Sequence, residues 1–169
     1  FAPSFYGLDF SELPALIGAF AYGPVAGVMI EFCKILIKLV LKPSSTAFVG
    51  ELANFSISCM LVLPASVIYL FKKSRKQAIL GTVVGTLIMT AFGSCFNAIY
   101  LLPKFSELYG IPLDAIIGMG TAINPAIHSI SGLVLMCVVP LNLLKGGLVS
   151  LITILVYKKL SPILKAAHK

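Results

Sequence analysis

Charged residues are scarce in this chain. They make up 11% of its 169 residues, whereas 59% are hydrophobic. A soluble domain usually carries about a quarter of charged residues, so the composition excludes an ordinary soluble domain. Several apolar stretches reach the roughly 20 residues that a helix needs to cross a hydrocarbon core, and they lack the alternation of barrel strands. We therefore expect an all-α membrane protein.

Catalytic and nucleotide-binding motifs are also missing. The chain contains no GxxxxGK[ST] phosphate loop and no GxSxG or HExxH sequence. Its two histidines are isolated, and its cysteines, Cys33, Cys59, Cys95 and Cys137, lie singly inside apolar runs. We interpret the cysteines as small buried hydrophobic residues. The sequence predicts neither an enzyme nor a metal site.

No basic stripe interleaved with aromatic residues accompanies the net charge of +7, so we expect no nucleic-acid partner. The cations gather instead at segment ends, in KKSRK (72–76) and in the tail YKKLSPILKAAHK (157–169). Lysine and arginine clusters beside membrane helices are typical of cytoplasmic loops. We therefore predict that both segments lie on the cytoplasmic side of the membrane.

Five apolar segments are predicted to be membrane helices within a single domain. The first two are divided at YGPVAG, because Gly23 and Pro24 disfavour a continuous helix. One kinked helix is the alternative. In the fourth segment, the small residues Gly81 and Gly85 predict close helix contact. The five segments are residues 11–22, 24–41, 47–71, 77–102 and 140–160.

A sixth apolar stretch, residues 115–138, is predicted not to cross the membrane. An even number of crossings must separate the two basic segments, and the helices on either side of this stretch already supply two. Its glycines, proline and polar residues are typical of a capping or re-entrant piece. We expect 103–139 to be an outer loop that contains this piece, and 1–10 to be an outer lid.

Polar side chains inside the apolar segments are candidates for a binding site, because such groups usually face a partner or a cavity. Asn97 lies beside an aromatic row, Phe92, Phe96 and Tyr100, which repeats every four residues. An amide next to aromatic rings suits a flat heteroaromatic ligand. Helix packing is the alternative explanation for the rings, so Phe96 is a weaker candidate than Asn97.

The sequence PLNLLKGG (140–147) places Asn142 and Lys145 three residues apart, so both side chains project from one helix face. A lysine that extends to the bilayer surface is the alternative. Gly146 and Gly147 favour close helix contact and would turn this face inward. We therefore expect Asn142 and Lys145 to contact a ligand.

Two further sets of polar residues have competing interpretations. Glu51 and Asn54 also share a helix face, and they either link helices by hydrogen bonds or lie near the ligand. Lys34 either forms an ion pair with Glu31 on its own helix, or it faces the cavity or pairs with Glu51.

The sequence LDFSELP resembles a helix start. Ser11 is predicted to be the N-cap, and Glu12 follows it in the first turn. Asp9 belongs to the same start and lies in the predicted outer layer, so it is a further candidate for ligand contact.

Four strings in this order, LDFSELPALIGAFAYGPVAGVMIEFCK, VGELANF, FNAIYLLP and VVPLNLLKGG, resemble the substrate-binding S-components of energy-coupling-factor (ECF) vitamin transporters, most closely their riboflavin-binding RibU branch. The resemblance runs from about Leu8 to Leu160. Members form compact bundles of six helices. The first of these would precede Phe1, so the resemblance implies that this sequence lacks it and leaves the surface for the coupling subunit undetermined.

The resemblance implies a bound substrate, riboflavin or a related flavin, and no cofactor. By this resemblance, Asn97, Asn142 and Lys145 would occupy the positions that bind the flavin in the family, and residues 1–10 would cover it. An asparagine amide offers one donor group and one acceptor to the flavin's pyrimidine edge, and lysine offers donors only. Another planar vitamin or nucleobase-like cargo is the alternative.

The resemblance also implies partners for uptake. These are a transmembrane coupling subunit and two cytoplasmic ATPases, alongside the lipid bilayer of a bacterial cell membrane. The missing phosphate loop is consistent with ATP hydrolysis by separate subunits.

Overall fold

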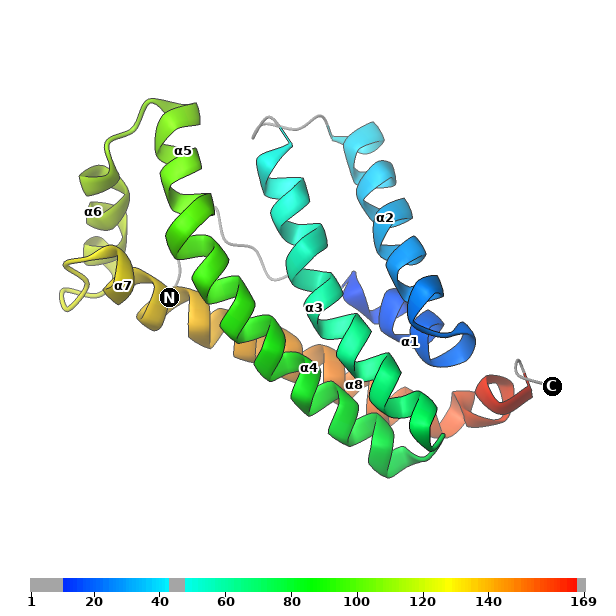
Figure 1. Cartoon of the computed structure of the whole chain (residues 1–169). Helices are drawn as coiled ribbons and strands as arrows, with labels where there is room; N and C mark the ends of the chain where they lie inside the picture. Colours follow the sequence, from blue (N-terminus) through cyan, green and yellow to red (C-terminus); the bar gives the residue numbers. More distant parts are fainter. Residues whose placement is uncertain (1–10, 43–47, 167–169) are drawn as a thin grey trace.

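The computed structural model describes residues 11–42 and 48–166, and all regular structure in these ranges is helical (Figure 1). The prediction of an all-α protein is confirmed. Two short π-helices, η1 and η2, form part of two of the long helices. In chain order the elements are α1 (Glu12–Tyr22), α2 (Pro24–Leu41), α3 (Val49–Phe71), α4 (Arg75–Phe96), η1 (Asn97–Leu101), α5 (Leu102–Tyr109), α6 (Leu113–Ile123), α7 (Ile130–Leu133), η2 (Val134–Val138) and α8 (Val139–Ala166).

Helices α1 and α2 are separate, as the YGPVAG sequence predicts. Gly23 between them has a φ angle of 101°, a conformation that residues with a Cβ atom rarely adopt. Pro24 then opens α2, where a missing N–H breaks no helical hydrogen bond. Ser11 occupies the predicted N-cap position of α1, but the expected cap by its side chain is wrong. Its backbone is already helical (φ −68°, ψ −8°), whereas a capping side chain needs extended backbone, and it makes no capping hydrogen bond.

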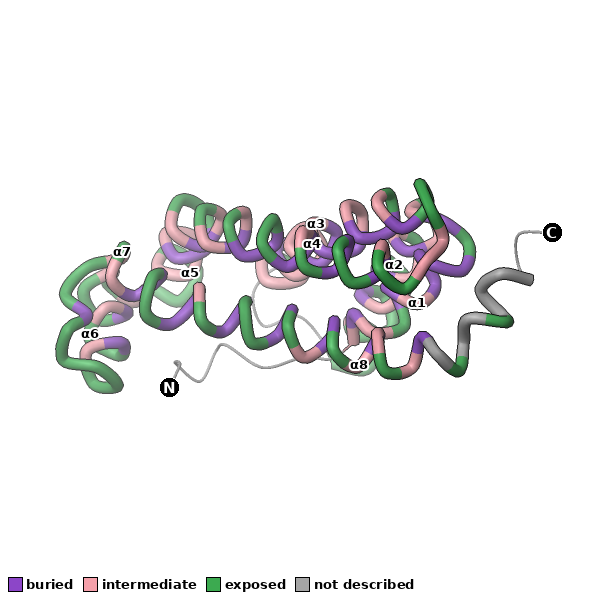
Figure 2. Tube along the Cα trace, turned by 90° about the horizontal axis from the view of Figure 1, so that it is seen from below, coloured by how far each residue is buried: buried purple, intermediate pink, exposed green. Residues whose placement is uncertain are grey.

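The helices form two layers. Helices α2, α3 and α4 lie side by side, and α1 and α8 pack behind them (Figures 1 and 2). Helices α3 and α4 approach closely because Gly81 and Gly85 face α3. A Cβ atom at either glycine would lie 2.5 Å from a carbonyl oxygen of α3, that of Ala65 or of Leu61. Buried positions recur along α8 where it packs against the other layer (Figure 2).

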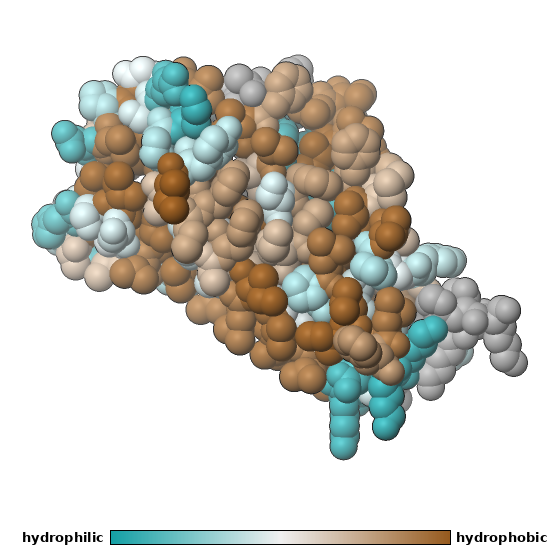
Figure 3. Space-filling model, viewed as in Figure 1, coloured by the Kyte–Doolittle hydropathy of each residue, from teal (hydrophilic) through white to brown (hydrophobic). Residues whose placement is uncertain are grey.

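Three helices in the described part of the chain are long and apolar enough to cross a membrane: Val49–Phe71, Arg75–Tyr109 and Ile130–Tyr157. Helix α1, with 11 residues, is only about 16 Å long and shorter than a bilayer core. A hydrophobic surface separates more hydrophilic ends of the molecule (Figure 3). The fold is therefore that of a membrane protein, and five crossings stay a prediction.

The stretch 115–138 is divided between two elements. Helix α6 ends at Ile123, and a new helix begins at Ile130 and continues through η2 into α8. The first half is therefore a short separate helix, whereas the second half is the outer part of the last long helix. That helix starts well before the predicted position 140.

Two apolar cores lie at opposite ends of the bundle. We call the end near residues 72–76 the inner end and the opposite one the outer end. At the inner end, Phe20 packs on Tyr69 with ring centroids 4.6 Å apart, and the Tyr69 hydroxyl lies 3.0 Å from the Tyr157 hydroxyl. At the outer end, Ile116 of α6 and Leu133 of α7 belong to a second buried cluster.

The interpretation of all four cysteines as buried is wrong for two of them. Cys59 and Cys137 are buried, but Cys33 and Cys95 are exposed. An apolar run of a membrane helix has a face that packs against no neighbouring helix, and composition alone does not separate that face from the buried one.

Candidate ligand-binding site

The centre of the site is a buried carboxylate on α1. Glu12 has a fully buried side chain, and its Oε1 lies 2.6 Å from Nζ of Lys145 on α8. The same oxygen accepts a hydrogen bond of 2.7 Å from the Ser58 hydroxyl of α3. Nζ of Lys34 on α2 is 3.8 Å away. Glu12 thus joins one helix of its own layer to two of the other.

Lys34 extends this arrangement to a second buried carboxylate. Its Nζ lies 2.5 Å from Glu31 Oε2 and donates a 3.5 Å hydrogen bond to Asn54 Oδ1, which also accepts from Ser58 at 3.4 Å. We call the six connected side chains the charge cluster: Glu12, Glu31, Lys34, Asn54, Ser58 and Lys145. Two carboxylates and two ammonium groups balance its formal charge.

Three buried polar atoms at this site have neither a hydrogen-bond partner nor an ion-pair contact among the described residues. They are Glu12 Oε2, Glu31 Oε1 and Asn142 Nδ2. A buried donor or acceptor without a partner costs about 1 to 3 kcal/mol. Two acceptors and one donor therefore remain for a polar molecule to satisfy.

Asn97 and Asn142 lie on either side of Gly93. A Cβ atom at Gly93 would be 2.8 Å from Asn142 Nδ2, so the glycine lets α8 bring this amide against α4. Asn97 is 2% exposed, and its Nδ2 donates a 2.7 Å hydrogen bond to the Gly93 carbonyl oxygen. The two amides therefore occupy neighbouring positions on facing helices.

Asn97 is also the first residue of the π-helix η1. The wide turn is closed by a hydrogen bond from the Leu102 N–H to the Asn97 carbonyl oxygen. A second wide turn, η2, closes from Val139 to Val134, just before Asn142, and the two π-helices contact each other. Such segments inside α-helices occur frequently at functional sites. No sequence pattern predicted them.

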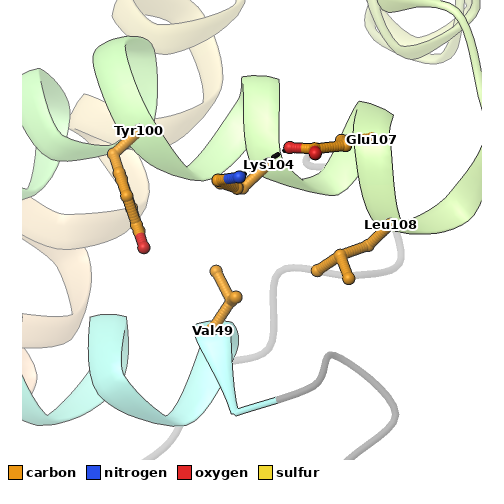
Figure 4. Close-up of a pocket in the computed structure, with 5 residues that line it drawn as sticks. All are labelled: Val49, Tyr100, Lys104, Glu107 and Leu108. Atoms are coloured by element: carbon orange, nitrogen blue, oxygen red, sulfur yellow. Dashed lines mark hydrogen bonds and ion pairs between the residues drawn. The ribbon is translucent and has the colours of Figure 1, made fainter.

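A cavity of about 530 Å³ opens at the outer end (Figure 4). It lies between the start of α3 and the η1–α5 segment, and its lining residues are Val49, Tyr100, Lys104, Glu107 and Leu108. Lys104 Nζ lies 2.6 Å from Glu107 Oε2. Pockets for small molecules span about 300 to 1,000 Å³, so the cavity has ligand size, but the residues that line it are not those of the charge cluster.

The aromatic row predicted from its spacing is a contiguous stack. The ring centroids of Phe92 and Phe96 are 5.5 Å apart, and those of Phe96 and Tyr100 are 5.1 Å apart. Phe96 is half-buried, and Tyr100 reaches into the outer cavity (Figure 4). The row therefore connects the level of Asn97 with the cavity.

The structure brings together most of the candidate residues. Lys34, Asn54 and Lys145 share the charge cluster. Asn142 lies one helical turn from Lys145, and Asn97 and Asn142 both contact Gly93. Lys34 forms the ion pair with Glu31 that was one of its two interpretations, and its other carboxylate contact is with Glu12. The remaining three candidates are elsewhere: Phe96 in the aromatic row, Glu51 half-buried in the first turn of α3, and Asp9 outside the described residues.

Sequence reasoning missed the role of Glu12. A carboxylate in the first turn of a helix usually complements the helix dipole, and this explanation accounts for Glu12 without an ion-pair partner. The balance of buried charges could have indicated that Glu12 has such a partner. Lys34 and Lys145 lie in apolar segments, and a buried ammonium group needs a carboxylate, for which Glu12 and Glu31 were candidates.

Comparisons with known proteins identify the family of the chain. The family model of the substrate-specific component of ECF transporters matches residues 1–157. The riboflavin transporter RibU of Staphylococcus aureus is 33% identical over 165 residues, which cover 98% of this chain and 80% of the relative. The riboflavin transporter FmnP of Bacillus subtilis is 29% identical over 163 residues, with 95% and 79% covered.

A solved S component of a bacterial ECF transporter has the same fold. It superposes with a TM-score of 0.71 at 34% sequence identity, covering 98% of this chain and 83% of that one. The family match extends over nearly the whole chain, so its membership does not depend on one motif. The chain belongs to the substrate-specific components of ECF transporters, which are transport proteins and not enzymes.

Proposed function

We propose that this chain binds riboflavin at the outer side of the charge cluster and holds it for uptake across a bacterial cell membrane. The observation that carries the proposal is the Asn142 amide, whose buried Nδ2 has no partner among the described residues. This atom lies against Gly93, whose carbonyl oxygen accepts from Asn97, and Asn142 is one helical turn from Lys145. Three similar proteins, among them one from Streptococcus thermophilus that is 27% identical over 164 residues, are named riboflavin transporters.

The chemistry of these residues suits a flavin. The pyrimidine edge of the ring alternates carbonyl acceptors with an imide donor, and an asparagine amide can pair with both kinds of group. Lys145 keeps donors for carbonyl or ribityl oxygens beyond the one directed to Glu12. The rings of Phe92, Phe96 and Tyr100 offer apolar surface for the flat faces of a heterocycle.

Transport by this chain requires partners. Members of the family are the substrate-specific part of a larger transporter. We infer that a transmembrane coupling subunit and two cytoplasmic ATPases supply the energy, because the chain itself has no phosphate-binding loop. In this assembly the riboflavin is the substrate and not a cofactor. Residues 1–10, which lie outside the described residues, are proposed to cover it.

A fluorescence titration tests the proposal. The purified chain in detergent should quench the fluorescence of added riboflavin at a stoichiometry of one, and protein purified from riboflavin-containing medium should carry a yellow chromophore. Colourless protein that leaves riboflavin fluorescence unchanged would refute it. Thiamine, a pteridine and a purine serve as competitors, since displacement by one of them at lower concentration than riboflavin would favour another planar cargo.

A further inference from the structure

Glu12 is the carboxylate in contact with Lys145. The ion pair of 2.6 Å connects α1 with α8, and the two side chains are 0% and 10% exposed. Ser58 fixes the carboxylate from the other side through its 2.7 Å hydrogen bond to the same oxygen. Both contacts to Oε1 leave Oε2 without a hydrogen-bond partner among the described residues. The Glu12 carboxylate therefore fixes the position of the Lys145 ammonium group, and Ser58 in turn fixes the carboxylate.

The charges around Lys145 cancel. Lys34 is balanced by Glu31, at 2.5 Å, and Lys145 by Glu12. Charges away from water act over longer distances than exposed ones, because little solvent screens them. A ligand beside Asn142 therefore meets ammonium donors in a neutral site. An uncharged polyol or heterocycle gains hydrogen bonds there, whereas a phosphate monoester, with a charge of about −1.5 to −2, meets no net positive charge.

We propose that Glu12 is a positioning and specificity-determining residue of the flavin site. It holds the Lys145 ammonium group near Asn142, and it cancels the lysine charge so that the site prefers the uncharged flavin to its phosphate monoester, flavin mononucleotide. This inference rests on the proposed function. It adds to it the charge of the preferred cargo and the residue that sets this preference.

Glu31 provides a matched control. It is as buried as Glu12 and belongs to the same charge cluster, but its ion-pair contact is with Lys34 and not with Lys145. The substitutions Glu12→Gln and Glu31→Gln remove the same charge from the same kind of environment. Any general effect of disturbing the cluster should therefore appear in both variants, and an effect that acts through Lys145 should appear mainly in Glu12→Gln.

The measured quantity is the ratio of the two dissociation constants, for riboflavin and for flavin mononucleotide, from fluorescence titrations of the purified chain. Glu12→Gln leaves Lys145 uncompensated, so we expect weaker riboflavin binding and a ratio shifted toward the phosphate ester by about tenfold or more. Glu31→Gln leaves the same net charge farther from Lys145, because its ion-pair contact is with Lys34, and should therefore shift the ratio less. Equal shifts in both variants, or equal weakening of both ligands by Glu12→Gln, would overturn the inference.

A second pair of variants applies if Glu12→Gln does not yield folded protein. Lys145→Gln leaves the Glu12 charge in excess and should shift the ratio away from the phosphate ester. The double variant Glu12→Gln with Lys145→Gln restores neutrality with two neutral side chains, and its ratio should return toward the original one. A double variant that keeps the ratio of Lys145→Gln would overturn the inference.

The two proposals fail in different ways. If the unmodified chain binds neither flavin, the proposed function falls and the inference falls with it. If the unmodified chain binds riboflavin and the ratio does not respond to Glu12, the inference alone is wrong.

Discussion

Two buried polar groupings of this bundle differ in how completely their atoms are paired. At the inner end, the Tyr69 and Tyr157 hydroxyls bond to each other at 3.0 Å inside a core of apolar side chains. In the charge cluster and at the adjacent Asn142, buried oxygen and nitrogen atoms remain without partners in the described residues. A satisfied buried pair stabilises a fold, whereas an incompletely paired set lowers stability and is retained where a ligand completes it.

This difference separates stability from binding. Substitutions in the inner core should lower the stability of the protein and leave ligand affinity almost unchanged. Substitutions of buried polar groups without a partner should lower ligand affinity and leave the stability of the protein almost unchanged. The predictions below test this contrast, beginning with the largest expected effect.

Replacement of Lys145 by alanine should have the largest effect. It removes the donors near Asn142 and leaves the buried Glu12 carboxylate without its 2.6 Å partner. A hydrogen bond from a charged group to the ligand contributes up to about 3 kcal/mol, so we expect riboflavin affinity to fall by about 100-fold. Fluorescence titration measures the loss.

The control for this variant is Lys38→Ala, which removes a lysine with an exposed side chain from another helix. The riboflavin affinity of this variant should stay within about twofold of that of the unmodified chain, because an exposed charge contributes little to binding. Comparable losses in both variants would mean that the net charge of the protein, and not the position of Lys145, determines binding.

Asn142→Ala should weaken riboflavin binding by about tenfold, the value of one or two lost hydrogen bonds. The ligand-free protein should keep its midpoint of thermal unfolding in detergent, because the buried Nδ2 atom has no partner to lose among the described residues. Titration and thermal unfolding of the same preparation provide both values. A lower unfolding midpoint with unchanged affinity would reverse the proposed contrast at this residue.

Tyr69→Phe should lower the free energy of unfolding by about 1 to 2 kcal/mol, because it leaves the Tyr157 hydroxyl buried and unpaired. Riboflavin affinity should change by less than about twofold. The double variant Tyr69→Phe with Tyr157→Phe removes both hydroxyls and should recover most of the stability. If the double variant is the least stable of the three, the hydroxyl pair is not what stabilises the inner core.

The helical fold could be predicted because hydrophobic composition over long segments leaves few alternatives in a bilayer. The break at Gly23 was also predictable, since its φ of 101° follows from a known property of glycine. Asn142 and Lys145 were predicted to face the interior together because of their spacing along one helix, and both are buried. Each of these features depends on residues close together in the sequence.

The features that were missed depend on contacts between distant residues. Glu12 and Lys145 are far apart in the chain, and the first turn of a helix explains a glutamate equally well without a partner. The wide turns at Asn97 and Val134 leave no pattern in hydropathy. The exposed faces at Cys33 and Cys95 are defined only by which helices pack together.

The smallest change in riboflavin affinity is expected for a substitution at the outer cavity. This measurement distinguishes a ligand at Asn142 and Lys145 from a ligand in the cavity. Lys104 and Glu107 form an ion pair as short as that of Lys145 and Glu12, but their side chains are 43% and 70% exposed. Solvent screens such a pair, so Lys104→Ala should change riboflavin affinity by less than about twofold if the ligand is held by Asn142 and Lys145. A loss comparable to that of Lys145→Ala would instead place the ligand in the cavity beside Tyr100 and Lys104. The unpaired atoms of the charge cluster would then need an explanation other than ligand binding.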